Sequence, residues 1–99
     1  MTDSRLTMAL VARIPATGVA DFQAYEDAVL QFLGRHGGVL ERRLRTVDGE
    51  VEIHVVSFPD AEALAAYRAD PERAEFGPLL TQSGAEMAIY EVIDVEGDG

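Results

Sequence analysis

Cysteine is absent from the chain of 99 residues. Without thiols the protein can form neither a disulfide nor a thiolate metal site, and it has no cysteine nucleophile. Lysine is absent too, so all 8 basic residues are arginines, against 18 acidic residues and a net charge of −10. Nucleic acids and anionic membranes are bound through cationic patches, and we therefore expect neither as a partner.

Long apolar runs are also missing. No segment approaches the roughly 20 apolar residues that a membrane span requires, and the N-terminal stretch MTDSR has no apolar signal core. We therefore expect a cytoplasmic protein without membrane contact. The 47% of hydrophobic residues is enough for a globular core, and the length allows one domain over residues 1–99. The polar tail, residues 96–99, is expected to be disordered.

The first half of the chain predicts a strand, a helix and a hairpin. Residues 6–14 alternate in the manner of a strand and carry apolar groups on both faces, which indicates a central position in a sheet. Residues 19–36 show helical spacing of apolar groups, and Gly37 and Gly38 end the pattern. Residues 39–47 and 50–58 are strand-like and flank Asp48-Gly49, a pair typical of a type I′ turn.

The hairpin has a predicted register. If Val47 and Glu50 flank the turn, Arg45 lies opposite Glu52, and the next pairs on that face follow at intervals of two. These are Arg43 opposite His54 and Glu41 opposite Val56. Opposite charges in such pairs mainly set the register, so the charged face needs no catalytic explanation.

The second half predicts helices and a last strand. Asp60 is the expected N-cap of a second helix, and Asp70-Pro71-Glu72 begins a short third one, while Gly77-Pro78 interrupts the pattern. Residues 85–95 form the last strand. The order predicts an α+β, ferredoxin-like split βαβ fold with a four-stranded antiparallel sheet and both helices on one face. The other face is too apolar to stay in water, and a second copy in a two-fold homodimer would cover it.

Several motifs in this order carry a family resemblance, which covers most of the chain from about residue 25 to 95. They are the Tyr25 helix ending in His36-Gly37-Gly38, the arginine-bearing second strand, the run from His54 to Asp60, Ala65-Ala66-Tyr67 and Asp70-Pro71-Glu72. With these motifs the chain resembles an uncharacterised bacterial family of the dimeric α+β barrel superfamily, related to antibiotic-biosynthesis monooxygenases. The superfamily also includes muconolactone isomerases and haem-degrading enzymes, so the resemblance implies a dimeric α+β barrel more firmly than a reaction.

Two departures from that family pattern stand out. Ser57 occupies the position before Phe58-Pro59 where the family usually has glutamate. The sequence Leu79-Leu80-Thr81-Gln82 stands where it tends to have an arginine. If those charged residues support a family activity, this chain lacks their contribution.

His54 is the candidate catalytic residue, because a neutral imidazole on a covered strand can act as a general base near neutral pH. The structural alternative is a histidine that is hydrogen-bonded across the sheet or at the dimer seam. His36 is interpreted as a positive charge capping the helix end. The two histidines have no spacing typical of metal ligands, so we predict no metal site and no cofactor.

The remaining candidates are aromatic residues and arginines. Tyr25 and Tyr67 lie on helix faces that pack against the sheet, where aromatic side chains usually form core. With Arg43, His54 and Phe58 they would instead line a small apolar cavity with a few polar groups, the usual composition of a ligand pocket. Arg42, Arg43 and Arg45 either hold an anion or are balanced by acidic neighbours.

Two functions follow from these residues. The first is a homodimer that holds a small apolar or aromatic ligand, in a cavity between sheet and helices or between subunits, or that merely assembles. The second, by analogy with the superfamily, is a cofactor-independent monooxygenase, isomerase or cyclase acting on an aromatic or polyketide-like substrate. In that case His54 is the base, and Arg43 or Tyr25 orients an oxyanion.

Overall fold

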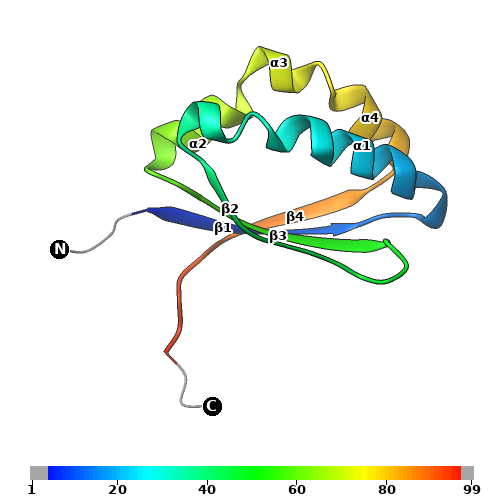
Figure 1. The fold of residues 1–99 in the computed structure, drawn as a ribbon, viewed down its shortest axis with the longest axis horizontal. Helices are drawn as coiled ribbons and strands as arrows, with labels where there is room; N and C mark the ends of the chain where they lie inside the picture. Colours follow the sequence, from blue (N-terminus) through cyan, green and yellow to red (C-terminus); the bar gives the residue numbers. More distant parts are fainter. Residues whose placement is uncertain (1–4, 97–99) are drawn as a thin grey trace.

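A computed structural model describes residues 5–96 of the chain (Figure 1). Residues 97–99 of the tail that was predicted to be disordered lie outside the described residues. The four strands are β1 (Leu6–Arg13), β2 (Val39–Arg45), β3 (Val51–Phe58) and β4 (Glu86–Val92). The helices are α1 (Val19–Leu30), α2 (Ala61–Arg68), α3 (Pro71–Ala74) and α4 (Gly77–Ser83), with short 3₁₀ turns η1 (Ala16–Gly18) and η2 (Gly34–His36).

The sheet confirms the predicted ferredoxin-like architecture. Its strands are antiparallel in the order β2-β3-β1-β4, so β1 is central, as its two apolar faces indicated. All four α-helices lie on one side of the sheet, and the other side is left uncovered (Figure 1). Within residues 5–96, no helix is both long and apolar enough to cross a bilayer.

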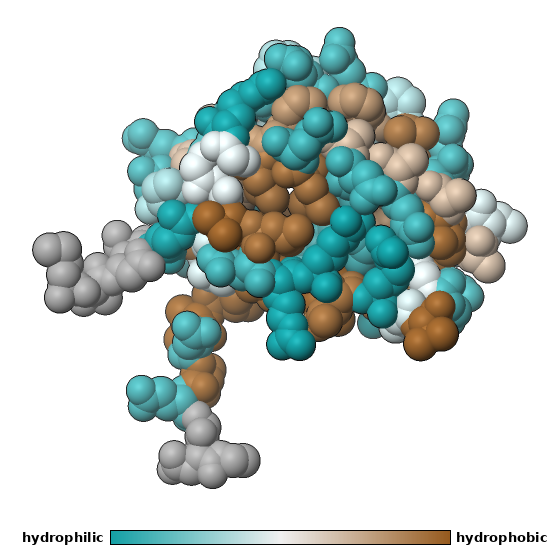
Figure 2. Space-filling view, viewed as in Figure 1, coloured by the Kyte–Doolittle hydropathy of each residue, from teal (hydrophilic) through white to brown (hydrophobic). Residues whose placement is uncertain are grey.

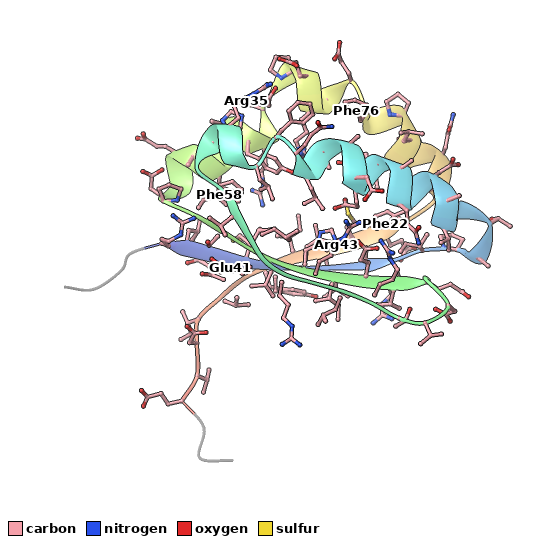
Figure 3. All side chains as sticks on the ribbon, in the orientation of Figure 1. Phe22, Arg35, Glu41, Arg43, Phe58 and Phe76 are labelled. Carbon is pink, nitrogen blue, oxygen red and sulfur yellow. The ribbon has the colours of Figure 1, made fainter. Side chains whose placement is uncertain are left out.

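The core occupies the layer between helices and sheet in two clusters. Ala12, Ile14 and Phe22 form one cluster, and Leu33, Phe58 and Tyr67 form the other. Figure 3 shows Phe22 and Phe58 toward opposite ends of this layer. Two separate clusters leave room between them, and the candidate site lies there.

The hairpin register is partly confirmed. Arg45 pairs with Glu52 and Arg43 with His54, as predicted. The predicted pairing of Glu41 with Val56 is wrong, because the register shifts between Leu40 and Arg42 and Leu40 takes the place opposite Val56. Glu41 is the extra residue of this irregularity, and its carboxylate accepts a hydrogen bond of 2.6 Å from the Ser57 hydroxyl. A bulge of this kind redirects one side chain without changing the rest of the strand.

The turn of the hairpin also differs from the prediction. A type I′ turn needs positive φ at two central residues, but Gly49 (φ 79°) is the residue here with positive φ and Asp48 is not. The Gly49 amide donates to the Thr46 carbonyl at 2.9 Å. Asp48 instead accepts from the Thr46 hydroxyl and the Glu50 amide, so the aspartate fixes the loop through its side chain.

The helix ends correct three further expectations. The helix predicted over residues 19–36 ends at Leu30, and the chain continues through η2 to Gly37, whose φ of 74° confirms the left-handed stop. His36 does not act as a cap, because its Nε2 bonds to Asp70 Oδ2 at 2.7 Å. Gly77-Pro78 begins α4 instead of interrupting a helix, since proline lacks only an amide that is unpaired in a first turn anyway.

Candidate functional site

A cavity of about 70 Å³ lies between the helices and the sheet. Most of its lining is apolar, and Figure 2 shows hydrophobic atoms gathered around a hollow in the middle of the molecule. The apolar lining residues come from β1, α1, β3, α2, β4 and the segment after α1: Met8, Leu10, Val29, Leu30, Leu33, Val56, Phe58, Leu64, Met87 and Ile89. The polar or charged lining residues are Glu26, His54, Tyr67, Arg68 and Arg73.

His54 lies in the middle of β3 and is 2% exposed. Its Nδ1 is 3.1 Å from Glu26 Oε2 on α1, and its Nε2 is 2.6 Å from Glu52 Oε1 on the same strand. Burial lowers the pKa of His54, but hydrogen bonds and charge from Glu26 and Glu52 outweigh burial and raise it. Both ring nitrogens are therefore taken up by carboxylate oxygens, and these contacts favour the protonated form of the ring.

Glu52 is fully buried and holds several cations together. Besides His54, Arg43 Nε donates to its Oε1 at 2.7 Å and Arg45 Nε to its Oε2 at 2.8 Å. Burial raises the pKa of Glu52, but these donors outweigh it and lower the pKa to about 2. In the group of three arginines, Arg43 and Arg45 are thus balanced by an acidic neighbour, while exposed Arg42 lies on the other face of β2.

Arg73 on α3 closes the other side of the cavity. Its guanidinium carbon lies 4.5 Å from the centre of the Tyr67 ring, and its Nη2 donates to the Tyr25 hydroxyl at 3.3 Å. Its Nε is buried and has no hydrogen-bond partner. Since buried donors are nearly always paired, this nitrogen is a candidate contact for a ligand.

The residues predicted from the sequence are only partly brought together. His54, Phe58 and Tyr67 line the cavity. Tyr25 is buried and touches Arg73 through its hydroxyl, but it does not line the cavity. Arg43 does not line the cavity either, and it contacts Glu52 and, through its Nη1 at 3.2 Å, Asp27. A role of Tyr25 or Arg43 in ligand binding would therefore be indirect.

Four residues of the site were not among the sequence candidates: Glu26, Glu52, Arg68 and Arg73. Of these four residues, Glu52 could have been predicted from the sequence. Residues two apart on a strand share a face, so a covered His54 requires a covered Glu52. For Glu26 and Arg73 the sequence offers no comparable signal, since both sit among other charged residues on helices.

A second charged cluster joins η2 to α3. Asp70 is 3% exposed at its side chain and bonds to His36 Nε2 and Arg35 Nη1. The hydrogen bond from His36 is the main cause that lowers the pKa of Asp70 to about 2. Asp70 also caps α3 through the Glu72 amide, so this cluster is sufficiently explained as a structural clamp. Across residues 5–96 there is no group of three or more histidine, aspartate or glutamate side chains arranged to hold a metal ion.

Comparisons with solved structures find the same fold in several proteins of low sequence identity. SnoaB, a cofactor-independent oxygenase from Streptomyces nogalater, superposes with a TM-score of 0.71 at 18% identity, covering 92% of this chain and 95% of that one. Rv0793 from Mycobacterium tuberculosis gives a TM-score of 0.74 at 12% identity, with 97% and 100% covered. A structure described as an antibiotic biosynthesis monooxygenase gives 0.76 at 12% identity, with 92% and 99% covered.

By sequence, no family model and no curated protein matches the chain. The structural likeness confirms the α+β, ferredoxin-like fold that the motifs indicated, and it covers nearly the whole length of each protein. The fold is shared by a cofactor-independent oxygenase and by a conserved protein of unknown function from Bacteroides thetaiotaomicron alike. Function must therefore be argued from the site.

Proposed function

We propose that the protein is a homodimer that binds a small apolar or aromatic molecule in the cavity between its helices and its sheet. The observation that carries this proposal is the composition of that cavity, with apolar walls and a few convergent polar groups. Ligand sites usually have this composition. A core built only for stability would have little reason to bury Glu26, Glu52 and His54 together, because each buried charge costs solvation energy.

The size of the cavity sets a condition on binding. At about 70 Å³ it is smaller than the 300 Å³ or more of typical ligand pockets, so a ligand must displace its walls. Several wall residues are methionine or leucine, including Met8, Leu30 and Met87. Methionine in particular is unbranched and repacks at low cost, which makes enlargement around a ligand feasible.

A screen of thermal shifts with single-ring aromatic and short aliphatic compounds tests this function. A binder should raise the melting temperature, and Leu10→Phe, which fills the cavity, should abolish that increase. Val47→Ile is the matched control, because it enlarges an exposed residue of the hairpin that does not line the cavity. Absence of any shift in the wild type, or an equal shift in Leu10→Phe, would refute binding in this cavity.

The homodimer is supported by the uncovered face of the sheet. Val39, Leu44 and Tyr90 on this face are 45%, 42% and 57% exposed. Beyond β4, Ile93 and Val95 are each 83% exposed, and the C-terminal segment leaves the sheet on the side away from the helices (Figure 1). Exposed large apolar side chains on one face of a sheet are typical of an interface, and a second copy would cover them by the same two-fold contact.

A second candidate function is cofactor-independent catalysis, as an oxygenase, isomerase or cyclase on an aromatic or polyketide-like substrate. The observation that favours it is the buried Glu26 side chain, which lines the cavity beside the His54 ring. Because both His54 nitrogens already face carboxylates, Glu26 is better placed than His54 to accept a proton from a bound substrate. Arg73 across the cavity would then stabilise the resulting oxyanion.

Proton transfer can be tested separately from binding. A binder with an acidic C–H bond should exchange that hydrogen for deuterium in D₂O when the wild-type protein is present, as measured by NMR. Glu26→Gln should bind the compound but stop the exchange, and His54→Ala should slow it. Full exchange in Glu26→Gln, or full turnover in His54→Ala, would remove the corresponding assignment.

A further inference from the structure

We propose that the ligand of this cavity is a small monocarboxylate, with an apolar tail inside the cavity and its carboxylate bound by Arg73 and Arg68. This inference rests on the proposed binding function and narrows it to one chemical class. It starts from the two arginines that line the cavity, since neither pairs with a carboxylate within residues 5–96.

The Arg73 side chain is held in place before any ligand arrives. The Tyr67 ring lies against one face of its guanidinium, and the Tyr25 hydroxyl accepts from Nη2. Both contacts leave Nε without a partner although it is buried. An arginine presents its N–H groups as a rigid planar fork that matches the two oxygens of a carboxylate. A fork already fixed by two tyrosines loses little further entropy when it binds.

Arg68 provides a second cation at the mouth of the cavity. It lies in the last turn of α2, is exposed and lines the opening. Three other arginines have carboxylate partners. Arg35 pairs with Asp70, and both Arg43 and Arg45 pair with Glu52. Unpaired arginines at one opening of a protein with a net charge of −10 therefore need an explanation.

The charges of the residues that line the cavity also favour an anionic ligand. Glu26 is the one carboxylate among the described lining residues, and it faces His54. Glu52 contacts His54 but does not line the cavity, and Arg43 and Arg45 balance its negative charge. Arg68 and Arg73 thus line the cavity without a paired carboxylate, and the charge of Glu26 acts on Arg73 only at longer range. A ligand without an acceptor would leave the buried Nε of Arg73 unsatisfied, and a neutral acceptor would satisfy it without balancing its charge.

The apolar walls of the cavity determine which chemical group can accompany the carboxylate of the ligand. A short aliphatic chain or one aromatic ring would pack against wall residues such as Met8, Leu30 and Met87. A second charged group would find no partner among these residues. A dicarboxylate or a phosphate ester of a sugar would therefore be rejected, because burying an unpaired charge is costly. The class that fits is a monocarboxylic acid with a compact apolar tail.

Isothermal titration with matched pairs of probes tests this inference. Benzoate is compared with benzamide, and butyrate with butyramide, on the wild-type protein. Each acid should bind at least roughly tenfold more tightly than its amide, which corresponds to about 1.4 kcal/mol. The preference should weaken at high salt, because part of it comes from the exposed charge of Arg68.

Three variants test whether Arg73 and Arg68 cause the preference for the acid over its amide. Arg73→Gln should remove most of the preference for the acid, and Arg73→Lys should restore only part of it, since lysine keeps the charge without the fork. Arg68→Gln changes an exposed residue and should reduce the preference without affecting folding. Gln82→Glu on α4 shifts the net charge by the same amount at an exposed site away from the cavity lining, and it should leave the preference unchanged.

The outcomes separate this inference from the function on which it rests. If the amides bind as tightly as the acids, or if Arg68→Gln and both Arg73 variants keep the preference, the carboxylate inference is wrong and the binding function stands. If neither member of either pair binds at millimolar concentration, and no neutral compound shifts the melting temperature, both proposals fail together.

Discussion

At the scale of single residues, Glu52 is the most consequential charge in the protein. It is fully buried and accepts bonds from Arg43, Arg45 and His54. Glu52→Gln keeps the shape of the side chain but removes its charge, so the cations around it lose their counter-ion. We expect the free energy of unfolding to fall by about 3 kcal/mol, the size typical of breaking a buried ion pair. Urea denaturation measures this change.

The matched control for Glu52 is Glu91→Gln, which removes the same charge from an exposed position on β4. Surface substitutions of this kind usually change stability by less than about 0.5 kcal/mol. If Glu52→Gln is as stable as Glu91→Gln, the buried carboxylate is not the centre of the network.

His54 gives the protein a dependence of stability on pH. Its folded pKa lies above the unfolded value of 6.5, because the bonds from Glu26 and Glu52 outweigh burial. The proton is therefore held more tightly in the folded state, and this stabilisation is fully present below pH 6.5 and lost as pH rises through the folded pKa. Other groups that face His54 or the cavity are Arg43, Arg73 and Tyr67, which keep their charge state near neutral pH.

The corresponding experiment compares unfolding free energies from pH 6 to 9 in the wild type and in His54→Gln. The wild type should lose stability across this range, and the variant should show a flatter profile. Parallel profiles would mean that His54 has the same pKa in both states. On the acid side, the pKa of Glu52 in the wild type is lowered from 4.5 to about 2, so its stabilisation is lost as the pH falls between these values.

At the scale of residues, the sequence predicted the chemistry only in part. The sequence predicted that His54 lies on a covered strand, but alternation alone did not decide which face of the sheet carries it. Its bonds to Glu26 on α1 and Glu52 on the same strand also differ from the bond across the sheet that was the alternative to catalysis. The partners Glu26 and Arg73 come from α1 and α3, and only the packing of those helices decides which of their charged residues turn inward. A single sequence contains no signal for that choice.

At the scale of elements, the contact between η1 and α4 depends on Gly18. Gly18 has ordinary backbone geometry, but a Cβ at this position would overlap the carbonyl oxygen of Ser83. Gly18→Ala must therefore push α4 away from η1. We expect a loss of about 1–3 kcal/mol, as for overpacking in a core. Thermal and urea unfolding would both report it.

Gly34→Ala is the matched control for Gly18→Ala. Gly34 lies in η2, and a Cβ there would meet no atom within 4 Å. Alanine at a compatible position restricts the unfolded chain and stabilises by about 0.4–1 kcal/mol. A destabilised Gly34→Ala together with an unchanged Gly18→Ala would contradict the close approach of η1 and α4.

The elements show where local rules suffice. The caps Asp60 and Asp70 were predicted correctly, because the bond from the side chain of an N-cap to a nearby amide is a local interaction. The irregularity at Glu41 was not predicted, since it depends on Ser57 of the neighbouring strand offering a hydrogen bond. The prediction of a type I′ turn was wrong for a similar reason. The Thr46 hydroxyl and the Glu50 amide both donate to the Asp48 side chain, and these bonds hold a different loop conformation.

At the scale of the whole molecule, the uncovered face of the sheet leads to the last prediction. Tyr90 lies on this face of β4 and is 57% exposed in the single chain. Tyr90→Arg should therefore leave the fold of one subunit intact. In a dimer that pairs the two sheets, the same change would bury an unpaired charge on each side, at a cost of several kcal/mol.

We expect light scattering to show a dimer for the wild type at micromolar concentration and a monomer for Tyr90→Arg. Ala66→Arg is the matched control, because it places the same charge on the exposed side of α2, away from the sheet. Circular dichroism should give the same spectrum for all three proteins. A wild-type protein that stays monomeric at micromolar concentration, or a Tyr90→Arg variant that still dimerises, would show that a second copy does not cover this face. The apolar residues Ile93 and Val95, which extend beyond β4 on the same side, would then need a different partner.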